Sequence, residues 1–226
     1  MKRFVLAAIL LAASGIAAAQ NLLTNGSFEA GLASWTLTES APGDCVFQAL
    51  SPPSNTGGFG AFPTQAPTDG AATLMSDANS PVDCLLTQDV VLATGGATLS
   101  YAAGYNYAAA GLPGTGVGCL AQVSIATTGG VPIATGYTRT GATNQAMAPR
   151  PPLSVSLAPG TTVRVTIHTV ACADGPAGIA ADNFVLLAAA GAANNVPTLS
   201  EWAMLLLALL MSGSALVALR RRRIRT

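Results

Sequence analysis

The sequence predicts an all-β fold in which two sheets form a sandwich, followed by a single C-terminal transmembrane helix. Strand-like runs recur along residues 20 to 190 between clusters of Gly, Pro, Asn and Asp. Within one run Val163, Val165 and Ile167 share a face, while the intervening side chains are polar, as in a half-buried strand. No window of this region sustains the 3.6-residue period of a helix. Many short strands with frequent turns indicate a two-sheet sandwich.

The expected strands follow one another at short intervals. We expect them at residues 35–39, 45–50, 84–92, 97–107, 119–127, 132–138, 153–157, 162–170 and 183–187. Residues 51–70 separate two expected strands by an unusually long loop rich in Pro and Gly, which is either functional or simply mobile. Gly104 lies inside an expected strand, where a glycine often marks a bulge. Residues 20–187 are thus predicted to form the β-sandwich, and residues 188–195 a linker of small residues.

The charge of the chain is low overall and unevenly distributed. The 226 residues include 10 Lys or Arg and 10 Asp or Glu, so the formal net charge is zero. Charged residues make up only 9% of the chain, which excludes a charge-driven nucleic-acid binder and a charge-rich disordered chain. Residues 20–195 hold three basic and nine acidic residues, a net charge of −6, whereas both ends are basic. This asymmetry indicates trafficking signals at the ends.

Residues 1–19 have the organisation of a secretory signal peptide. Lys2 and Arg3 form a positive start, and residues 4–13 form an apolar stretch that is too short to span a bilayer. Small residues at 17–19 supply a cleavage pattern, so the mature chain is expected to begin at Gln20. The alternative is an uncleaved membrane anchor. In both cases the residues that follow are exported.

Residues 202–219 form an uncharged, apolar run of 18 residues near the C-terminus. As a helix this run would be about 27 Å long, close to the thickness of the hydrocarbon core of a membrane. A basic cluster follows at once and acts as a membrane stop on the cytoplasmic side. Its members are Arg220, Arg221, Arg222, Arg223 and Arg225. Export by the signal peptide and a cytoplasmic C-terminus agree on a single-pass topology.

The residues that precede and open this helix make its interpretation more specific. They are Val196, Pro197, Thr198, Leu199, Ser200, Glu201 and Trp202. This motif, the apolar helix and the terminal Arg cluster together resemble the IPTL-CTERM sorting tail over residues 196 to about 223, with Val in place of the Ile that the family name implies. The resemblance implies a Gram-negative envelope protein that sits transiently in the inner membrane. An exosortase-type membrane protease would recognise its tail and remove or exchange it during delivery to the cell surface or matrix.

The two ends of the exported segment carry a second resemblance. Residues 21–29, followed by Gly31 and Trp35, and residues 181–186 are similar to the opening and closing strands of carbohydrate-binding, galactose-binding-like jelly rolls. The resemblance implies that these two strands lie side by side, with Glu29 and Asp182 as ligands of a structural calcium. Calcium takes six to eight oxygens, so two carboxylates alone do not make a site. The alternative is that both carboxylates bind turn amides.

The four cysteines, Cys45, Cys84, Cys119 and Cys172, all lie in the exported segment. An oxidising compartment predicts two disulfides, and spacing cannot choose among the three pairings. We favour Cys45–Cys84 and Cys119–Cys172, which would bridge successive strand regions. The chain has no Cys-x-x-Cys pair and a single His, which argues against a metal site built from these residues.

The sequence contains few residues that could perform chemistry. His168 is alone in an expected strand and no nucleophile signature accompanies it, so we expect no catalysis and no required cofactor. Sugars stack on aromatic rings, and the candidates for such contacts are Trp35, Tyr105, Tyr107 and Tyr137. Tyr105 and Tyr107 share the strand parity of Leu99, so packing in the core is the alternative for them.

Three classes of function remain open. The first, which we favour, is an exported surface or matrix protein whose sandwich binds polysaccharide or another surface partner. The second is a purely structural envelope component without a specific ligand. The third is an exported hydrolase, which the absence of a catalytic signature makes the weakest.

Overall fold

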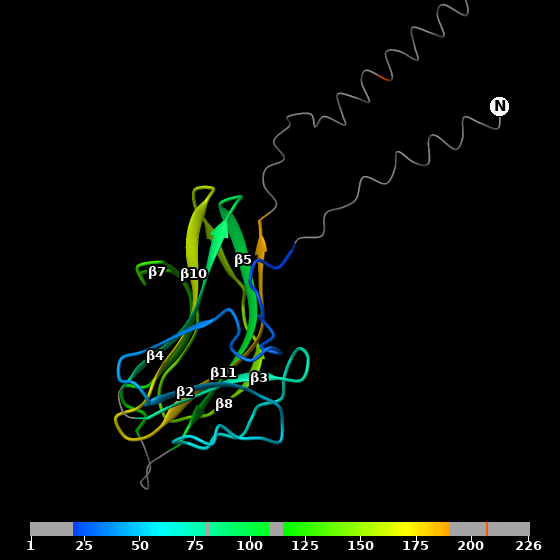
Figure 1. The fold of residues 1–226 in the computed structure, drawn as a ribbon. Coiled ribbons are helices and arrows are strands. Elements are labelled where there is room, and N and C mark those ends of the chain that lie inside the picture. The colour runs from blue at the N-terminus through cyan, green and yellow to red at the C-terminus, as the bar shows by residue number, and fades with distance from the viewer. Residues whose placement is uncertain (1–19, 80–81, 109–114, 190–206, 208–226) are drawn as a thin grey trace, which may run out of the picture. The chain divides into compact units, whose positions relative to one another are not determined.

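The computed structural model describes residues 20–79, 82–108 and 115–189, together with Leu207. Within these residues two antiparallel sheets form a sandwich, as the sequence predicts (Figure 1). The first sheet has the order β1-β4-β10-β6-β7, with bounds Thr36–Glu39, Asp83–Leu92, Thr161–Val170, Leu120–Thr127 and Pro132–Arg139. The second has the order β2-β3-β11-β5-β8, with bounds Cys45–Leu50, Thr73–Ala78, Ala177–Ala188, Gly96–Tyr107 and Gln145–Pro149. A short strand β9, Leu153–Ser156, also pairs with β5.

Each expected run overlaps an observed strand, but two strands were missed. All six residues of β3 are buried, so the strand shows no alternation of apolar and polar residues. Strand β8 has only five residues and ends at Pro149. Strand β11 was expected to begin at residue 183, but it begins at Ala177. Its first part was missed because it consists mostly of small residues with low β-propensity.

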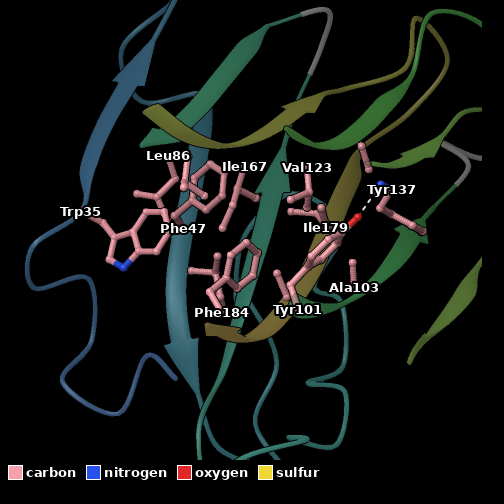
Figure 2. Packing of buried hydrophobic residues seen from close by; sticks show 14 of the residues in the cluster. Trp35, Phe47, Leu86, Tyr101, Ala103, Val123, Tyr137, Ile167, Ile179 and Phe184 are labelled. Carbon is pink, nitrogen blue, oxygen red and sulfur yellow. Dashed lines mark hydrogen bonds between the residues drawn. The ribbon is translucent and has the colours of Figure 1, made fainter. Parts of the chain in front are cut away.

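Aromatic rings from distant parts of the chain meet in the core between the sheets. Phe28, Trp35 and Phe184 pack together with ring centroids 5.3 to 5.9 Å apart, and Tyr101 lies 5.5 Å from Phe184 (Figure 2). Pairs at these separations add to the free energy of burial. Phe184 reaches the core because β11 shifts register against β5 just after Asp182, at a bulge that changes which residues face inward.

The first and last segments of the domain lie side by side, as the jelly-roll resemblance implies. Asn21 pairs with Leu187, and the Leu22 N–H donates to the Leu186 carbonyl at 2.8 Å. Gly26 lies against the backbone of Phe184 so closely that a side chain at this position would collide with it. The opening segment therefore closes the sandwich along β11, although it forms bridges and turns rather than a regular strand.

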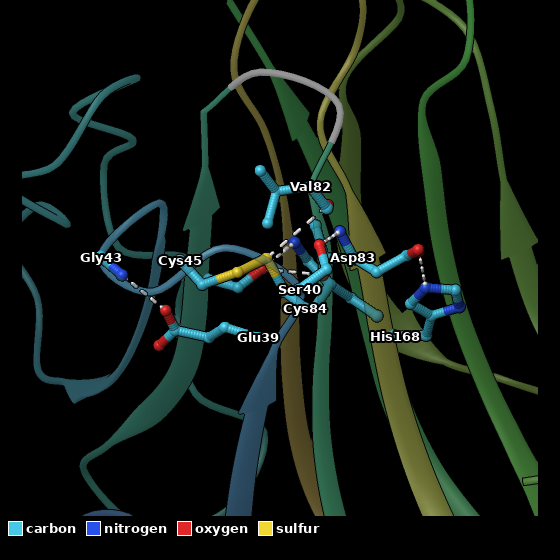
Figure 3. The surroundings of a disulfide bond; sticks show 11 residues. Glu39, Ser40, Gly43, Cys45, Val82, Asp83, Cys84 and His168 are labelled. Carbon is cyan, nitrogen blue, oxygen red and sulfur yellow. Dashed lines mark hydrogen bonds and ion pairs between the residues drawn. A yellow bond between two sulfur atoms is a disulfide. The ribbon is translucent and has the colours of Figure 1, made fainter.

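Both favoured disulfides are present. Cys45 begins β2 and Cys84 lies in β4, so this bond joins the two sheets (Figure 3). Cys119 and Cys172 flank the paired ends of β6 and β10 and join two neighbouring strands of one sheet. The bonds close segments with sequence separations of 39 and 53 residues, which restricts the unfolded chain.

Several expectations concern other parts of the chain. The signal peptide at residues 1–19 and the sorting motif at residues 196–202 lie outside the described residues. The same holds for the basic end and for the expected membrane helix at residues 202–219, of which only Leu207 is described. Among the described residues, no helix has the length and apolar character needed to cross a membrane.

Candidate functional site

The structure places most of the expected aromatic ligand residues in the core. Trp35 is 8% exposed, Tyr105 0% and Tyr137 8%, so none of these three offers a free ring face for a sugar. Tyr107 is half-buried and packs against the same core. The Trp35 indole donates to the Asn25 carbonyl at 3.2 Å, which fixes the ring inside the opening turn. The expectation of stacking on Trp35, Tyr105 and Tyr137 is therefore corrected: these rings stabilise the sandwich.

The outer face of the second sheet is covered by the Pro/Gly-rich segment of residues 51–72, which we call the covering loop. Phe62 of this loop is 4% exposed and packs on Met75 of β3 and Ala180 of β11. These three residues form a small apolar cluster separate from the main core. The loop is therefore a packed part of the domain.

Asp77 of β3 holds the first half of the covering loop. Its carboxylate is completely buried and accepts the Thr56 hydroxyl at 2.7 Å and the Gly60 N–H at 2.9 Å. The Phe62 N–H donates in turn to the Thr56 hydroxyl at 3.0 Å. A buried carboxylate is tolerated here because the loop supplies donors to it.

Glu29 and Asp182 hold the second half of the covering loop. Asp182 Oδ2 accepts the N–H groups of Thr68 and Asp69 at 2.6 and 2.9 Å. Glu29 Oε1 accepts the N–H groups of residues 71 and 72, both at 2.8 Å. The two carboxylates thus bind loop amides, which was the alternative to the calcium site.

The same contacts bear on whether calcium fits these residues. The groups that surround the two carboxylates are N–H and O–H donors, whereas calcium requires oxygen lone pairs. Within residues 20–79, 82–108 and 115–189, no three His, Cys, Asp or Glu side chains gather closely enough to hold a metal ion. The N–H and O–H groups around Glu29 and Asp182 fit hydrogen bonding to the carboxylates. A structural calcium at these residues stays a prediction.

A first cavity, of about 390 Å³, lies between the covering loop and β8. Four side-chain amides line it, and we call it the amide cavity: Gln65, Asn106, Asn144 and Gln145. Gln65 Nε2 donates to Asn106 Oδ1 at 3.1 Å, and its Oε1 accepts the Met147 N–H. Asn106 is 7% exposed, and its Nδ2 is buried with no hydrogen-bond partner among the residues that the structure describes. The amide cavity therefore holds an unused donor.

Gly104 allows this arrangement. It lies at the point where the pairing of β5 with β8 shifts register. A Cβ at this position would come within 2.8 Å of Gln65 Oε1 and 2.6 Å of the Met147 nitrogen. The glycine expected to mark a bulge thus lets the covering loop reach the edge strand.

A second cavity, of about 570 Å³, opens between β7 and the chain that follows β8. Tyr137, Arg139, Gln145 and Arg150 line it, and we call it the arginine cavity. The Arg150 guanidinium carbon lies 4.6 Å from the centre of the Tyr137 ring, a cation–π contact. The Tyr137 hydroxyl donates to Gln145 Oε1 at 3.0 Å. Since Gln145 lines both cavities, they are neighbours along β8.

The hydroxyl of Tyr137 keeps its proton at neutral pH. Burial raises its pKa to about 12, although the nearby Arg150 and Arg139 act in the opposite direction. The Tyr137 backbone is also fixed, because its N–H donates to the Tyr101 hydroxyl at 2.6 Å (Figure 2). Tyr137 thus presents a protonated phenol at a defined position in the cavity.

His168 lies on the outer face of the first sheet, away from both cavities. Its Nε2 lies 2.9 Å from Asp83 Oδ1 of the neighbouring strand β4 (Figure 3). Arg164 lies on β10, as His168 does, and donates to Asp89 of β4 through two hydrogen bonds of 2.7 and 2.9 Å. Both are cross-strand pairs between charged or polar side chains, of the kind that stabilises a sheet. They support the hydrogen-bonded role for His168.

Of the residues that line the two cavities, the sequence nominated only Tyr137. Asn106 lies in an expected strand, where a single amide has no distinctive pattern, and Gln145 begins β8, which was not expected, so neither residue gave a signal. One signal was present: Arg139 and Arg150 are two of the three basic residues of an acidic domain.

Comparisons with known proteins identify a motif in the C-terminal part of the chain. Residues 196–223 match the IPTL-CTERM motif. No curated protein is detectably similar to the chain.

Solved structures resemble the sandwich at low identity. A family 61 carbohydrate-binding module in complex with β-1,4-galactotriose has 16% identity and a TM-score of 0.48, over 75% of this chain and 99% of that one. The K3 cleaved adhesin domain of Lys-gingipain from Porphyromonas gingivalis has 15% identity and a TM-score of 0.47, over 74% and 99%. An arabinose-bound α-L-arabinofuranosidase has 16% identity and a TM-score of 0.48, over 77% of this chain and 27% of that one. The chain thus carries an IPTL-CTERM motif behind a β-sandwich that is similar to carbohydrate-binding modules.

Proposed function

We propose that the chain is an exported cell-surface protein whose non-catalytic β-sandwich binds polysaccharide through the amide cavity. The IPTL-CTERM motif supports export and sorting to the cell surface. Under this proposal an exosortase-type protease of the inner membrane processes the tail, and the sandwich remains at the cell surface or in the matrix.

The observation that carries the binding function is the unpartnered Asn106 Nδ2 in a cavity lined by amides. A side-chain amide offers both donors and an acceptor, which matches the hydroxyl groups of a sugar. A buried donor without a partner costs free energy in the free protein, and a ligand hydroxyl would remove that cost when the Asn106 amide turns toward the cavity. Concave sites with a few convergent polar groups are typical ligand sites.

A glycan array tests the proposal with the purified protein, in the presence of calcium and of chelator. We expect binding to one class of polysaccharide, and an Asn106→Ala variant should lose about tenfold in affinity. Gln122→Ala is the matched control, since Gln122 is a strand amide of the other sheet and does not line either cavity. Absence of binding by the folded protein would favour the structural alternative, and release of shortened glycan would favour the hydrolase.

A further inference from the structure

The basic residues of the sandwich are few and are divided into two environments. Residues 20–195 contain three arginines against nine acidic residues. Arg164 is paired with Asp89 at 2.7 Å, so its charge is compensated. In the part of the chain that the structure describes, no carboxylate forms an ion pair with Arg139 or Arg150. Both of these arginines line the arginine cavity.

Arg150 is held rigidly in this cavity. Its Nε and Nη2 donate to the Ala103 carbonyl at 2.8 and 2.6 Å, and its plane is packed against the Tyr137 ring. Nη2 also donates to the Ala146 carbonyl at 3.2 Å, so among the described residues these contacts leave Nη1 as the end of the guanidinium that can meet a ligand. A fixed guanidinium loses little entropy when it binds an anion.

Arg139 has a donor for which the described residues supply no acceptor. Its Nη2 donates to the Thr143 carbonyl at 3.3 Å, but its Nε is buried and no described group accepts from it. A buried charged donor without a partner is costly, and few such groups occur in native structures. An anionic ligand that binds the Arg139 guanidinium from the cavity would compensate its charge.

We propose that the arginine cavity binds the carboxylate groups of an acidic polysaccharide, with Arg139 and Arg150 as its anion ligands. This inference rests on the proposed function and names the class of its ligand. Guanidinium and carboxylate groups form strong, bidentate hydrogen bonds. Arg150 covers the Tyr137 ring, so recognition here depends on charge and hydrogen bonding rather than on stacking.

A uronic acid chain fits this site better than an acidic peptide does. The arginine cavity adjoins the amide cavity through Gln145, whose side chain already accepts the Tyr137 hydroxyl. Hydroxyl-rich ligands use such mixed donors and acceptors beside the carboxylate, whereas a run of Asp or Glu side chains would not. The remaining surface, at a net charge of −6 for residues 20–195, would repel a polyanion, so binding must be local.

Isothermal titration with three probes tests the proposal on the purified protein. The probes are an oligogalacturonate, the same oligosaccharide after reduction of its carboxyl groups to alcohols, and poly-L-glutamate. We expect the oligogalacturonate to bind about tenfold more tightly than either of the others, and added salt to weaken it. Arg139→Gln and Arg150→Gln should each lower its affinity about tenfold, and Arg139→Lys should recover part of the loss.

Arg164→Gln is the matched control, because it removes the same charge from β10, at a position that does not line the arginine cavity. Thermal melts of each variant show that the domain is folded, and Arg139→Gln carries the test where Arg150→Gln unfolds. Equal binding of the acidic and the reduced oligosaccharide would overturn this inference and leave the proposed function standing. Equal binding of poly-L-glutamate would indicate a protein partner and overturn it as well. Binding of neither oligosaccharide would overturn this inference, and the glycan array then decides the proposed function separately.

Discussion

The contacts below the covering loop and the two cavities beside β8, the amide cavity and the arginine cavity, both contain several polar groups. They differ in whether the protein supplies hydrogen-bond partners for these groups. Over the second sheet, Asp77 and Asp182 are completely buried, and each accepts hydrogen bonds from the covering loop. In the cavities on either side of Gln145, the Asn106 Nδ2 of β5 and the Arg139 Nε of β7 are buried, and no described residue accepts a hydrogen bond from them. The first region therefore serves stability. The second holds unused donors, which is the condition expected of a site that meets its partner from outside.

The largest effect should come from removing an acceptor below the covering loop. Asp182→Ala leaves the N–H groups of Thr68, Asp69 and Asn183 without their acceptor. We expect a loss of about 3 kcal/mol in the free energy of unfolding, since several part-buried hydrogen bonds to one buried carboxylate are lost at once. Urea denaturation measures the loss, and the exposed Asp89→Ala is the control, with about 1 kcal/mol or less. A loss for Asp182→Ala no larger than that of the control would show that the loop is not held by this carboxylate.

Chelation should have a smaller effect on the same region. If calcium binds at Glu29 and Asp182, EDTA lowers the melting temperature, as we predict from the jelly-roll resemblance. Because loop amides already satisfy both carboxylates, we expect the shift to be smaller than that of Asp182→Ala. The melting temperature with and without EDTA, followed by return of excess calcium, measures it. An unchanged melt would exclude a structural calcium.

In the arginine cavity, a substitution of Arg139 should weaken binding without lowering the stability of the domain. Arg139→Met removes a buried donor that has no partner and keeps much of the side-chain volume. We expect the free energy of unfolding to stay within about 0.5 kcal/mol or to rise, while binding of the oligogalacturonate falls. Urea denaturation measures the free energy of unfolding, and calorimetric titration of the same preparation measures the affinity for the oligogalacturonate. Destabilisation by more than about 1 kcal/mol would assign Arg139 to the fold instead.

The smallest expected effect is the pH dependence of stability that comes from the Arg164–Asp89 ion pair. This pair lies neither below the covering loop nor in the two cavities. The hydrogen bond from Arg164 holds the pKa of Asp89 below its ordinary value of 3.8. The folded state therefore binds this proton less readily than the unfolded chain does, so the pair contributes stability above about pH 4 and loses it as the pH falls further. Melting temperatures of the wild type and Asp89→Asn should converge in acid. A difference that persists at the lowest pH would contradict the assignment.

Much of the fold could be predicted from the sequence, because half-buried strands alternate visibly. Val163, Val165 and Ile167 face the core as expected. Strand β3 could not be recognised, because the covering loop buries its outer face and removes the alternation. The cavities could not be predicted either, since Gln65 and Gln145 are 80 residues apart and meet only through the fold. Trp35 was misjudged for a related reason: a ring in a loop motif has the same sequence signal whether it faces solvent or Phe28.

Hydrogen–deuterium exchange of the purified protein, with and without the polysaccharide that it binds, tests the central claim most directly. We expect protection confined to residues 65–66, Asn106, β8, the end of β7 and Arg150, with residues 56–62 of the covering loop unchanged. Protection of residues 56–62 and β3, without any change along β8, would contradict it.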